Sequence, residues 1–578
     1  MSDPTSTPHA ADPAAAADPA AAATSAEPAV VDAVVVGAGF AGMYMLYRLR
    51  ERGLTAMVLE AGTDVGGTWY WNRYPGARCD VPSMEYSYSF DPGLEQDWEW
   101  TELMAAQPEI LAYARHVADR FDLRRDITFE TRVTAAHWND DRQRWHVRTD
   151  RGHDVEARWC IMATGCLSVP NTPDLPGLGS FAGTVLHTGR WPKEEPDLTG
   201  LRVGVVGTGS SGVQAIPVLA ERAGHLTVFQ RSPVYTVPAG NKPLRPETAA
   251  EFKARYAEIR ERQRNSATGF LGPLALKEPR PPRTDGDGVS GAREGGGSGR
   301  RGLLDLPPEE REAAFDRFGP GAYQRFRDVY TDPEANEVAC ELFRREIRKI
   351  VQDPETAAGL EPREYPLACK RPVIDTHYYE TFNRPDVTLV DLRRSPLVEV
   401  TPAGVRTTEG EVPLDVLVLA TGFDAMTGAL SRIDLTGRAG RPLSDVWADG
   451  PRTYLGLQME DFPNLFMVNG PGSPSVLSNM IVSIEHHVEW IAAALDHLAA
   501  AGRTTIEPAP EAVEAWVAHV NELAEGTMYT APSCNSWYLG SNIEGKPRVF
   551  MPYVGGFGRY RQRCTEIADA GYDGFVLA

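Results

Sequence analysis

The strongest constraint on this chain is a strand, a tight glycine turn and a helix that follow one another between residues 31 and 52. Residues 31–36 are mostly apolar, and Gly37, Gly39 and Gly42 then give the spacing G-x-G-x-x-G at the start of a periodic segment. The first glycine permits the turn, the second lets a pyrophosphate approach the backbone, and the third lets the helix pack on the strand. Phosphates would therefore meet the N-terminus of a helix.

A carboxylate at the end of the next expected strand strengthens this prediction. Glu60 follows residues 55–59 and stands where a ribose hydroxyl is held, at the usual distance after the glycines. Glycines at this spacing also occur in ordinary loops, so the triplet alone is a weak signal. Two strands, a helix and Glu60 together predict a dinucleotide-binding unit.

Residues 66–80, GGTWYWNRYPGARCD, form an expected loop that is crowded with aromatic and charged side chains. Flat rings suit the faces of an isoalloxazine, and Arg73, Arg78 and Asp80 suggest a polar reaction centre beside it. The alternative is a small aromatic core with charges on its surface. The aromatic residues are Trp69, Tyr70, Trp71 and Tyr74.

A second unit of the same plan begins at Leu201. Where the first unit places Glu60, this one places Arg231 and Ser232, and an arginine there suits a ribose 2′-phosphate better than a free hydroxyl. The presence of an arginine instead of a glutamate at this position favours NADPH over NADH as the cofactor. The alternative is that Arg231 is a solvated charge at a strand end. The expected elements are strand 203–206, glycines Gly207, Gly209 and Gly212, helix 211–222 and strand 226–230.

Two units that end in opposite charges imply two cofactors, with FAD in the first unit and NADPH in the second. Such a chain can pass hydride to the flavin, and the flavin can deliver electrons to a disulfide, a quinone or oxygen. The seven cysteines include no C-x-x-C pair, so we expect no disulfide framework, no redox dithiol and no metal site. Oxygen becomes the leading acceptor.

Composition excludes several other classes. A net charge of -21 argues against nucleic acid, whose phosphates would be repelled. Residues 1–29 lack a basic region and an apolar core, so they are expected to form a disordered tail rather than a secretory signal. No window has the roughly twenty uncharged apolar residues that a membrane span requires. With sparse cysteines, these features predict a cytoplasmic enzyme.

Residues 181–192 carry the spacing F-x-G-x-x-x-H-x-x-x-W-P, which includes His187 and Trp191. This spacing resembles the fingerprint of the flavin-dependent Baeyer-Villiger monooxygenases that bind FAD and NADPH on a single chain. A histidine in a linker between two nucleotide units is expected, with Trp191, to couple their motions rather than to transfer protons. Other motifs that look like this family are the loop 66–80, both glycine units, Ala-Thr-Gly at 163 and 420, and Cys-Lys-Arg-Pro at 369.

The resemblance covers residues 31 to about 558 and implies an α/β fold class. Two Rossmann-like dinucleotide-binding domains, for FAD and for NADP, would be accompanied by an inserted helical subdomain. Helices are expected at 107–121, 247–263, 308–318, 336–351 and 480–500, and strands at 127–133, 144–149, 159–163 and 414–420. The expected domains are FAD-binding 30–165 and 396–578, linker 166–192, NADP-binding 193–235 and 370–395, and helical 236–369 with a mobile loop at 284–302.

The same motifs imply the residues of each site. FAD is expected at Gly37, Gly39, Gly42, Glu60, Thr68, Trp69, Tyr70, Trp71, Asp80, Tyr86 and Val133. NADP is expected at Arg78, Cys79, Thr208, Gly209, Ser210, Ser211, Gly212, Val213, Gln214, Arg231, Ser232, Lys370, Arg371 and Trp537. The expected substrate loop contains Ser475, Val476, Leu477 and Met480.

For the reaction, the resemblance implies that NADPH reduces the flavin, that oxygen forms a C4a-peroxyflavin, and that its deprotonated form attacks a ketone to give an ester or lactone. An anion in a water-poor site needs a fixed positive partner, which Arg371 would supply while Asp80 holds its guanidinium. Terpenoid, steroid and macrocyclic ketones stay open as substrates, and a monomer and a dimer are both compatible with the sequence. The alternatives are a flavin N- or S-hydroxylase and a non-catalytic NADPH-binding sensor.

Overall fold

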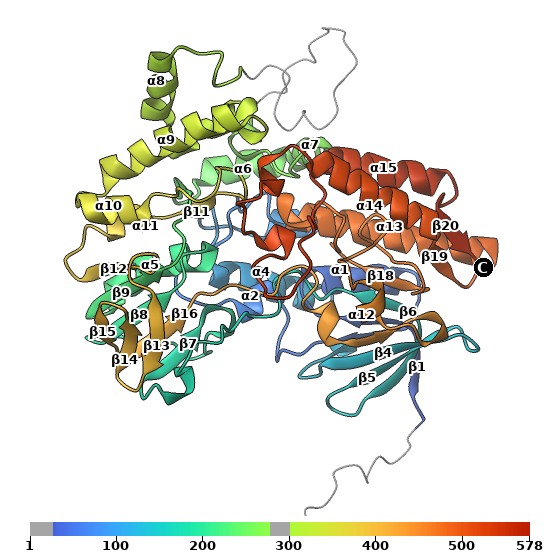
Figure 1. The fold of residues 1–578 in the computed structure, drawn as a ribbon. Coiled ribbons are helices and arrows are strands. Elements are labelled where there is room, and N and C mark those ends of the chain that lie inside the picture. The colour runs from blue at the N-terminus through green and yellow to red at the C-terminus, as the bar shows by residue number, and fades with distance from the viewer. Residues whose placement is uncertain (1–26, 278–300) are drawn as a thin grey trace, which may run out of the picture.

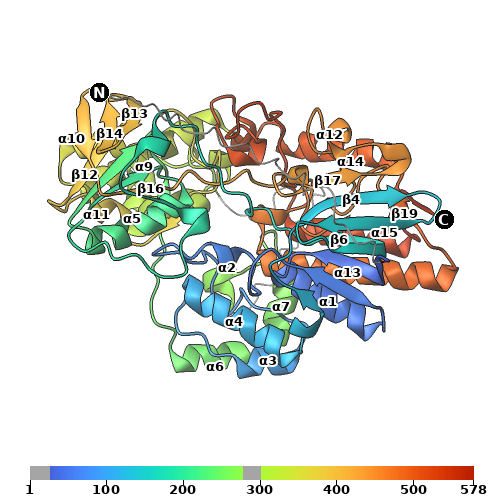
Figure 2. The ribbon, with the colours of Figure 1, turned by 90° about the horizontal axis from the view of Figure 1, so that it is seen from below.

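The computed structural model describes residues 27–277 and 301–578. Residues 1–26 of the expected tail and residues 284–300 of the expected mobile loop lie outside the described residues. The described chain forms two lobes, each built around its own sheet (Figures 1 and 2). One lobe contains the first glycine unit and the other contains the second.

The first glycine unit lies in an eight-stranded sheet with β1 (Ala29–Val36) near its centre. β1 pairs in parallel with β2 (Ala56–Leu59) on one side and with β6 (Asp154–Met162) on the other. The strand order is β17-β4-β5-β6-β1-β2-β3, and β18 also pairs with β6. The other strands are β3 (Ile127–Thr128), β4 (Val133–Asn139), β5 (Arg144–Thr149), β17 (Asp434–Thr436) and β18 (Leu465–Met467).

The strand expected at residues 127–133 is divided in the structure. The chain turns between β3 and β4, where Glu130 has a φ of 54° and the Thr131 N–H donates to the Glu60 carbonyl at 2.8 Å. An apolar run does not reveal such a turn when no glycine or proline marks it. The turn places the start of β4 beside the end of β2, where Glu60 lies.

The second glycine unit lies in a five-stranded parallel sheet with the order β12-β9-β8-β16-β7. This order corrects the expected domain boundary at residue 396. Strand β16 was assigned to the FAD-binding domain, but it pairs with β8 and β7 of the second sheet. The order also places part of the expected linker, β7, in this sheet. The strands are β7 (Thr184–His187), β8 (Arg202–Val206), β9 (His225–Gln230), β12 (Val387–Asp391) and β16 (Val416–Leu419).

Helices cover one face of the first sheet. Helix α1 (Phe40–Glu51) packs against α13 (Met480–Ala501), and the two lie side by side in Figure 2. Their apolar faces join the largest buried core of the protein. The same core includes residues of α4 (Gln107–Arg120), α14 (Pro510–Ala524) and α15 (Phe557–Asp569).

The expected helical insertion is shared between the two lobes. α7 (Tyr256–Asn265) packs on the core of the first lobe, whereas α9 (Pro333–Ile350) packs on that of the second. The helix expected at 247–263 is broken at Arg255, whose φ and ψ of -117° and 12° end α6 (Pro246–Ala254). Helix α8 has the bounds Pro308–Phe318.

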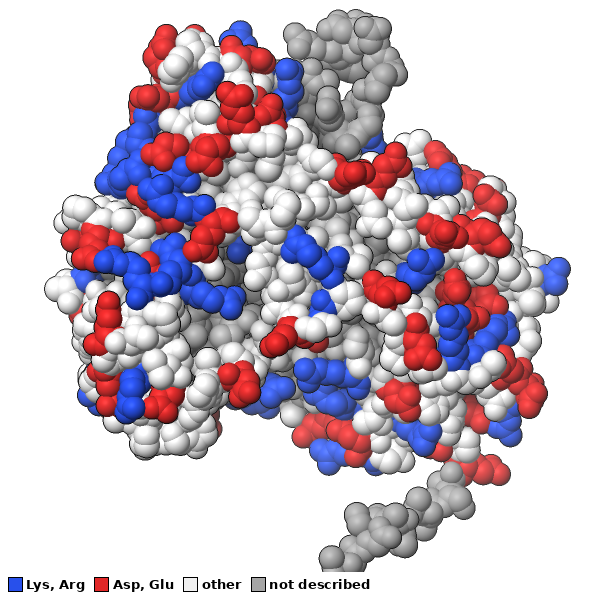
Figure 3. All heavy atoms as spheres, viewed as in Figure 1, with Lys and Arg blue, Asp and Glu red and all other residues white. Residues whose placement is uncertain are grey.

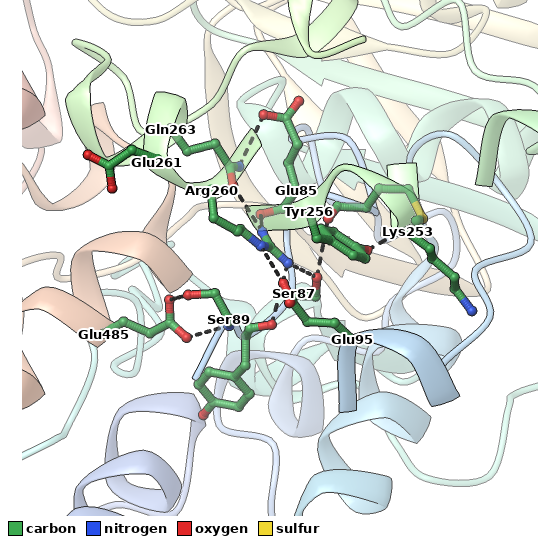
Figure 4. Close-up of polar contacts among 12 residues, drawn as sticks. Glu85, Ser87, Ser89, Glu95, Lys253, Tyr256, Arg260, Glu261, Gln263 and Glu485 are labelled. Carbon is green, nitrogen blue, oxygen red and sulfur yellow. Dashed lines mark hydrogen bonds and ion pairs between the residues drawn. The ribbon is translucent and has the colours of Figure 1, made fainter. Parts of the chain in front are cut away.

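A buried ionic network fastens α7 to the first lobe (Figure 4). The Arg260 guanidinium donates to Glu95 at 2.8 Å and to the Ser87 hydroxyl at 2.7 Å. The Glu85 carboxylate accepts from the backbone N–H groups of Leu271 and Gly272 at 2.6 and 2.7 Å. Since a buried charge is costly unless it is paired, these contacts fix the position of α7.

The network also contains a carboxyl group with an unusual pKa. Glu485 in α13 accepts hydrogen bonds from the backbone N–H and the hydroxyl of Ser89 at 2.5 and 2.6 Å. Burial raises the pKa of Glu485 to about 7, although the Ser89 donors and the charge of Arg260 act in the opposite direction. The desolvation of a carboxylate is therefore the dominant effect here.

On the molecular surface, acidic and basic side chains are interspersed over the face drawn in Figure 3. No helix among residues 27–277 and 301–578 is both long enough and apolar enough to cross a membrane.

Replacing Glu485 with Gln should remove part of the pH dependence of stability. The folded-state pKa of about 7 lies above the ordinary 4.5, so the contribution of Glu485 to stability is greatest below pH 4.5 and is lost as pH rises through 7. The loss for one group amounts to at most about 3 kcal/mol. Thermal unfolding at pH 5 and pH 8 measures it, with Glu514→Gln on the exposed face of α14 as control. Equal pH dependence in wild type and Glu485→Gln would contradict the assignment.

Candidate functional site

The first glycine turn is held by a close backbone approach. Gly37 has a φ of 103°, and a Cβ on it would lie 2.7 Å from the carbonyl oxygen of Ala163. A Cβ on Gly42 would collide with the carbonyl of Gly37. Within the described residues no side chain caps the N-terminus of α1, so its first N–H groups are free for phosphate oxygens.

The second glycine turn repeats these contacts. Gly207 has a φ of 107°, and a Cβ on it would lie 2.5 Å from the carbonyl oxygen of Ala420. Gly209 is exposed, and an added Cβ there would have no heavy atom within 4 Å. Helix α5 (Ser210–Arg222) also has no side-chain cap among the described residues. Both turns therefore offer an open backbone and a helix N-terminus, which fits one dinucleotide in each unit.

Glu60 lies at the end of β2 and is 5% exposed. Its carboxylate accepts from the Ala38 N–H at 2.7 Å and from the Gly62 N–H at 2.6 Å. Burial raises its pKa despite these two donors. The geometry holds a carboxylate beside the first turn of α1, and its remaining lone pairs suit the hydroxyls of a ribose.

The aromatic loop begins with a short helix, α2 (Thr68–Trp71), that the glycine content of the loop did not indicate. The Trp69 indole donates to the Tyr86 hydroxyl at 3.2 Å. Trp69 and Tyr70 belong to the main core, so these rings stabilise the fold, and their contact with FAD stays a prediction. Thr68 is exposed, Trp71 is half-buried and packs edge-on against Tyr70, and Val133 is buried at the start of β4.

Two cations meet at the end of the second unit. Burial, together with the charge of the exposed Arg231, lowers the pKa of Lys370 to about 8. The Thr208 hydroxyl donates to the Ser232 carbonyl at 3.0 Å, which ties the glycine turn to this strand end. Ser210 is exposed nearby in sequence, whereas Val213 is fully buried and only its backbone can reach a ligand. Like charges held together favour an anion such as a phosphate.

Gln214, Arg78 and Cys79 lie at the contact between the two lobes. The Tyr74 hydroxyl donates to Gln214 at 2.8 Å, and the Gln214 amide donates to the Arg78 carbonyl at 3.0 Å. The Arg78 guanidinium bonds Glu102, and Cys79 is buried. The side chains of Tyr74 and Gln214 connect the lobes, and direct contact of Arg78, Cys79 and Gln214 with NADP stays a prediction.

Arg371 and Asp80 form an ion pair between segments far apart in the sequence. Their side chains are 44% and 26% exposed. The negative charge of Asp80 raises the pKa of Arg371, so the guanidinium keeps its proton. The charge of Arg371 also acts on the buried phenol of Tyr538, which the sequence patterns did not single out.

His187 lies at the end of β7 and forms three hydrogen-bond contacts. Its Nδ1 accepts from the Gly189 N–H at 3.0 Å, and its Nε2 lies 3.2 Å from the Asn171 carbonyl and 3.3 Å from the Thr421 hydroxyl. Burial lowers its pKa, which keeps the ring neutral. Trp191 is buried in the core of the second lobe. His187 thus ties the chain that enters the second lobe to the second Ala-Thr-Gly turn.

The expected substrate loop lies against the C-terminal segment. Ser475 is fully buried, and Val476 and Met480 pack with Trp537 around a small cluster of buried apolar residues. Leu477 packs on the core of the second lobe. The cluster consists of Cys166, Ala425, Met426 and Met551.

The expectation of unpaired cysteines is wrong at one place. Cys369 and Cys534 form a disulfide bond, although 165 residues separate them. Spacing patterns detect only cysteines that are close in sequence, so no signal in the chain could have identified this pair. The remaining five cysteines are free and buried.

Comparisons with known proteins agree with this geometry. A family model described as pyridine nucleotide-disulphide oxidoreductase matches residues 34–268. A Baeyer-Villiger monooxygenase of Pseudooceanicola batsensis is 41% identical, over 94% of this chain and 96% of its own. The phenazine N-monooxygenase PhzNO1 of Lysobacter antibioticus is 41% identical over 94% and 97%. The solved structure of an oxidised steroid monooxygenase bound to NADP is 50% identical, with a TM-score of 0.85, over 95% and 99%.

Replacing Gly209 with Ala should weaken NADPH binding and leave the fold and FAD content unchanged. The added methyl group meets no protein atom within 4 Å but occupies the approach to the α5 N-terminus. Loss of charged hydrogen bonds to the pyrophosphate costs about 1.5 to 3 kcal/mol, or roughly 10- to 100-fold in Kd. Titration with NADPH measures it. Gly179→Ala, also in open space, is the matched control. Unchanged affinity would place the pyrophosphate elsewhere.

Proposed function

The chain belongs to the family of FAD- and NADPH-dependent Baeyer-Villiger monooxygenases, and from this premise we propose that it converts a cyclic or bulky ketone to an ester or lactone with Arg371 as the catalytic cation. The Arg371–Asp80 ion pair is the observation that carries the proposal. When bound, FAD supplies activated oxygen from O2, after reduction by NADPH.

Arg371 stabilises negative charge during oxygen insertion. A guanidinium has five N–H donors, and the Asp80 carboxylate orients one side of it while 44% of the side chain stays exposed. A fixed cation stabilises an oxyanion that develops on the ketone without the cost of reorganising solvent. Asp80 touches Arg371 rather than the ketone, so its role is positioning.

The remaining site residues divide between binding and coupling. Glu60 binds a ribose hydroxyl of FAD, and the pair Arg231 and Lys370 binds the 2′-phosphate of NADPH. His187 couples the lobes by holding the linker at Asn171 against Thr421 of the second lobe. Val476, Met480 and Trp537 form an apolar wall, which supports a ketone with a large hydrocarbon skeleton.

One comparison favours a second candidate function. The phenazine N-monooxygenase PhzNO1 is as similar as the Baeyer-Villiger relative, at 41% identity. Oxygen transfer to a ring nitrogen needs an electrophilic oxygen and no stabilised oxyanion on carbon. N-oxidation is therefore the competing proposal, and it makes Arg371 less important for product formation.

A substrate panel tests both proposals. Oxygen-dependent NADPH consumption is measured with terpenoid, steroid and macrocyclic ketones and with N-heteroaromatic compounds, and products are identified by mass. We expect a gain of one oxygen atom in a ketone, with an ester or lactone as product. N-oxides alone, with no ketone converted, would exclude the proposed reaction.

Replacing Arg371 with Ala should separate the two half-reactions. Hydride transfer from NADPH needs proximity of two bound rings, so flavin reduction should survive within about an order of magnitude. Ester formation should fall about 100- to 1000-fold, because a preorganised charge contact is lost. Lys should rescue poorly, since its compact charge lacks a planar fork. Stopped-flow kinetics measure both steps, with exposed Arg394→Ala as control. Near-normal ester yield in Arg371→Ala would show that another residue stabilises the negative charge during oxygen insertion.

Replacing Arg231 with Ala should reduce the preference for NADPH over NADH. The lost phosphate contact costs about 1.5 to 3 kcal/mol. Lys370 adds a pH signature, because its pKa of about 8 means that NADPH binding weakens as pH rises through 8 and the ammonium loses its proton. Without the Arg231 charge, the pKa of Lys370 rises and the weakening shifts to higher pH. Coenzyme titrations from pH 7 to 10 measure both effects, and an unchanged preference would remove Arg231 from the phosphate site.

A further inference from the structure

We propose that the Cys369–Cys534 disulfide is a positioning element of the reaction centre. It fixes the position of Arg371 relative to Trp537. The inference rests on the proposed function, because that proposal assigns roles to these two residues. Cys369 precedes Arg371 by two residues, and Cys534 precedes Trp537 by three. The bond therefore joins the two segments that carry them.

The bond lies inside the protein rather than on its surface. Both cysteines are 1% exposed, and their Cα atoms are 5.8 Å apart. They belong to the core of the second lobe, with Tyr538 and Leu367. External thiols do not reach a disulfide that is buried to this extent, so its role is structural rather than that of an exchanging pair.

The C-terminal segment has a second attachment, on the far side of Trp537. Lys546 forms an ion pair with Asp424 at 2.7 Å, and the Asn542 amide donates to the Phe423 carbonyl at 2.9 Å. Trp537 lies between these polar contacts and the disulfide. Because the polar contacts can exchange with water, the disulfide is the attachment that fixes one end of the segment permanently.

The turn around Cys534 is itself held in place. The Arg548 guanidinium donates to the Cys534 carbonyl at 2.8 Å and to the Ala531 carbonyl at 3.0 Å. The direction in which the chain leaves the disulfide is thereby set. Trp537 and Tyr538 follow within one short helix, Trp537–Leu539.

The segment contacts both halves of the proposed reaction centre. The charge of Arg371 acts on the buried phenol of Tyr538, and Trp537 packs on the same buried cluster as Val476 and Met480 of the substrate loop. A shift of this segment would change the surroundings of the catalytic cation and the wall of the substrate site together. Reaction steps that depend on both, above all oxygen insertion, should be more sensitive than flavin reduction.

Thiol counting tests the bond itself. The denatured wild type should present five free thiols without reductant and seven after reduction. Seven thiols in the isolated protein would remove the basis of the inference. The count should stay at five after anaerobic treatment with NADPH. A rise to seven would mean that two electrons and two protons reach the disulfide, making it an electron acceptor and overturning the positioning role.

The variant Cys369→Ala/Cys534→Ala tests the role. We expect FAD content and flavin reduction to be unchanged and the KM for NADPH to be higher. The share of oxidised NADPH that yields product should fall about 10-fold, because small displacements at a reaction centre are costly. Cys564→Ala, a free buried cysteine in α15, is the matched control. Unchanged coupling of NADPH oxidation to product would overturn the inference.

A second measurement covers the case in which the double variant does not fold. The wild type is reduced with a phosphine in dilute denaturant, which opens the buried bond, until seven thiols are present, and it is assayed after the denaturant is removed. It is then reoxidised, again in dilute denaturant, with a diazene oxidant that accepts two electrons and two protons per disulfide, and it is assayed once more. Coupling should fall on reduction and return when the count is again five. Coupling that is the same in both states would overturn the inference. Absence of product from the untreated wild type with every ketone would instead count against the proposed function.

Discussion

The structure depends on one close approach in each lobe, between the first glycine of the nucleotide turn and a carbonyl of a neighbouring segment. Gly37 packs on the carbonyl of Ala163, and Gly207 packs on that of Ala420, with room for no larger residue. Each contact brings the end of one parallel strand against the turn that opens a helix. The free N–H groups of that helix, the position proposed to bind ribose and the Ala-Thr-Gly turn are thereby gathered at one edge of each sheet.

The proposed reaction centre lies where the two lobes meet rather than within either one. Asp80 and Tyr74 come from the loop that follows the first unit, whereas Arg371 and Gln214 come from the second lobe. Each cross-lobe contact pairs one residue from each side. The relative position of the lobes therefore controls whether Asp80 orients the Arg371 guanidinium.

The sequence predicted local elements well and long-range assignments less well. Glycine spacing and the Glu60/Arg231 contrast indicated both nucleotide units, because strand, turn and helix are consecutive in the chain. Strand β16 was assigned to the wrong sheet, since a buried apolar run fits either sheet equally well. The Cys369–Cys534 bond joins segments that only the fold brings together. Arg371 was found through a resemblance, and neither its charge nor its spacing distinguished it from other cations.

Counting hydrogen-bond donors separates the structural arginine from the catalytic candidate. Arg260 is 3% exposed and uses its guanidinium on Glu95, Ser87, Gln263 and the carbonyls of Glu85 and Tyr88 (Figure 4). Among the described residues, the Arg371 guanidinium has a hydrogen bond only from Nη2 to Asp80. A guanidinium has five N–H donors, so Arg260 is satisfied by the fold, whereas Arg371 retains donors for an anion. A charge that is fixed on one side and free on the other is what stabilisation of a developing oxyanion requires.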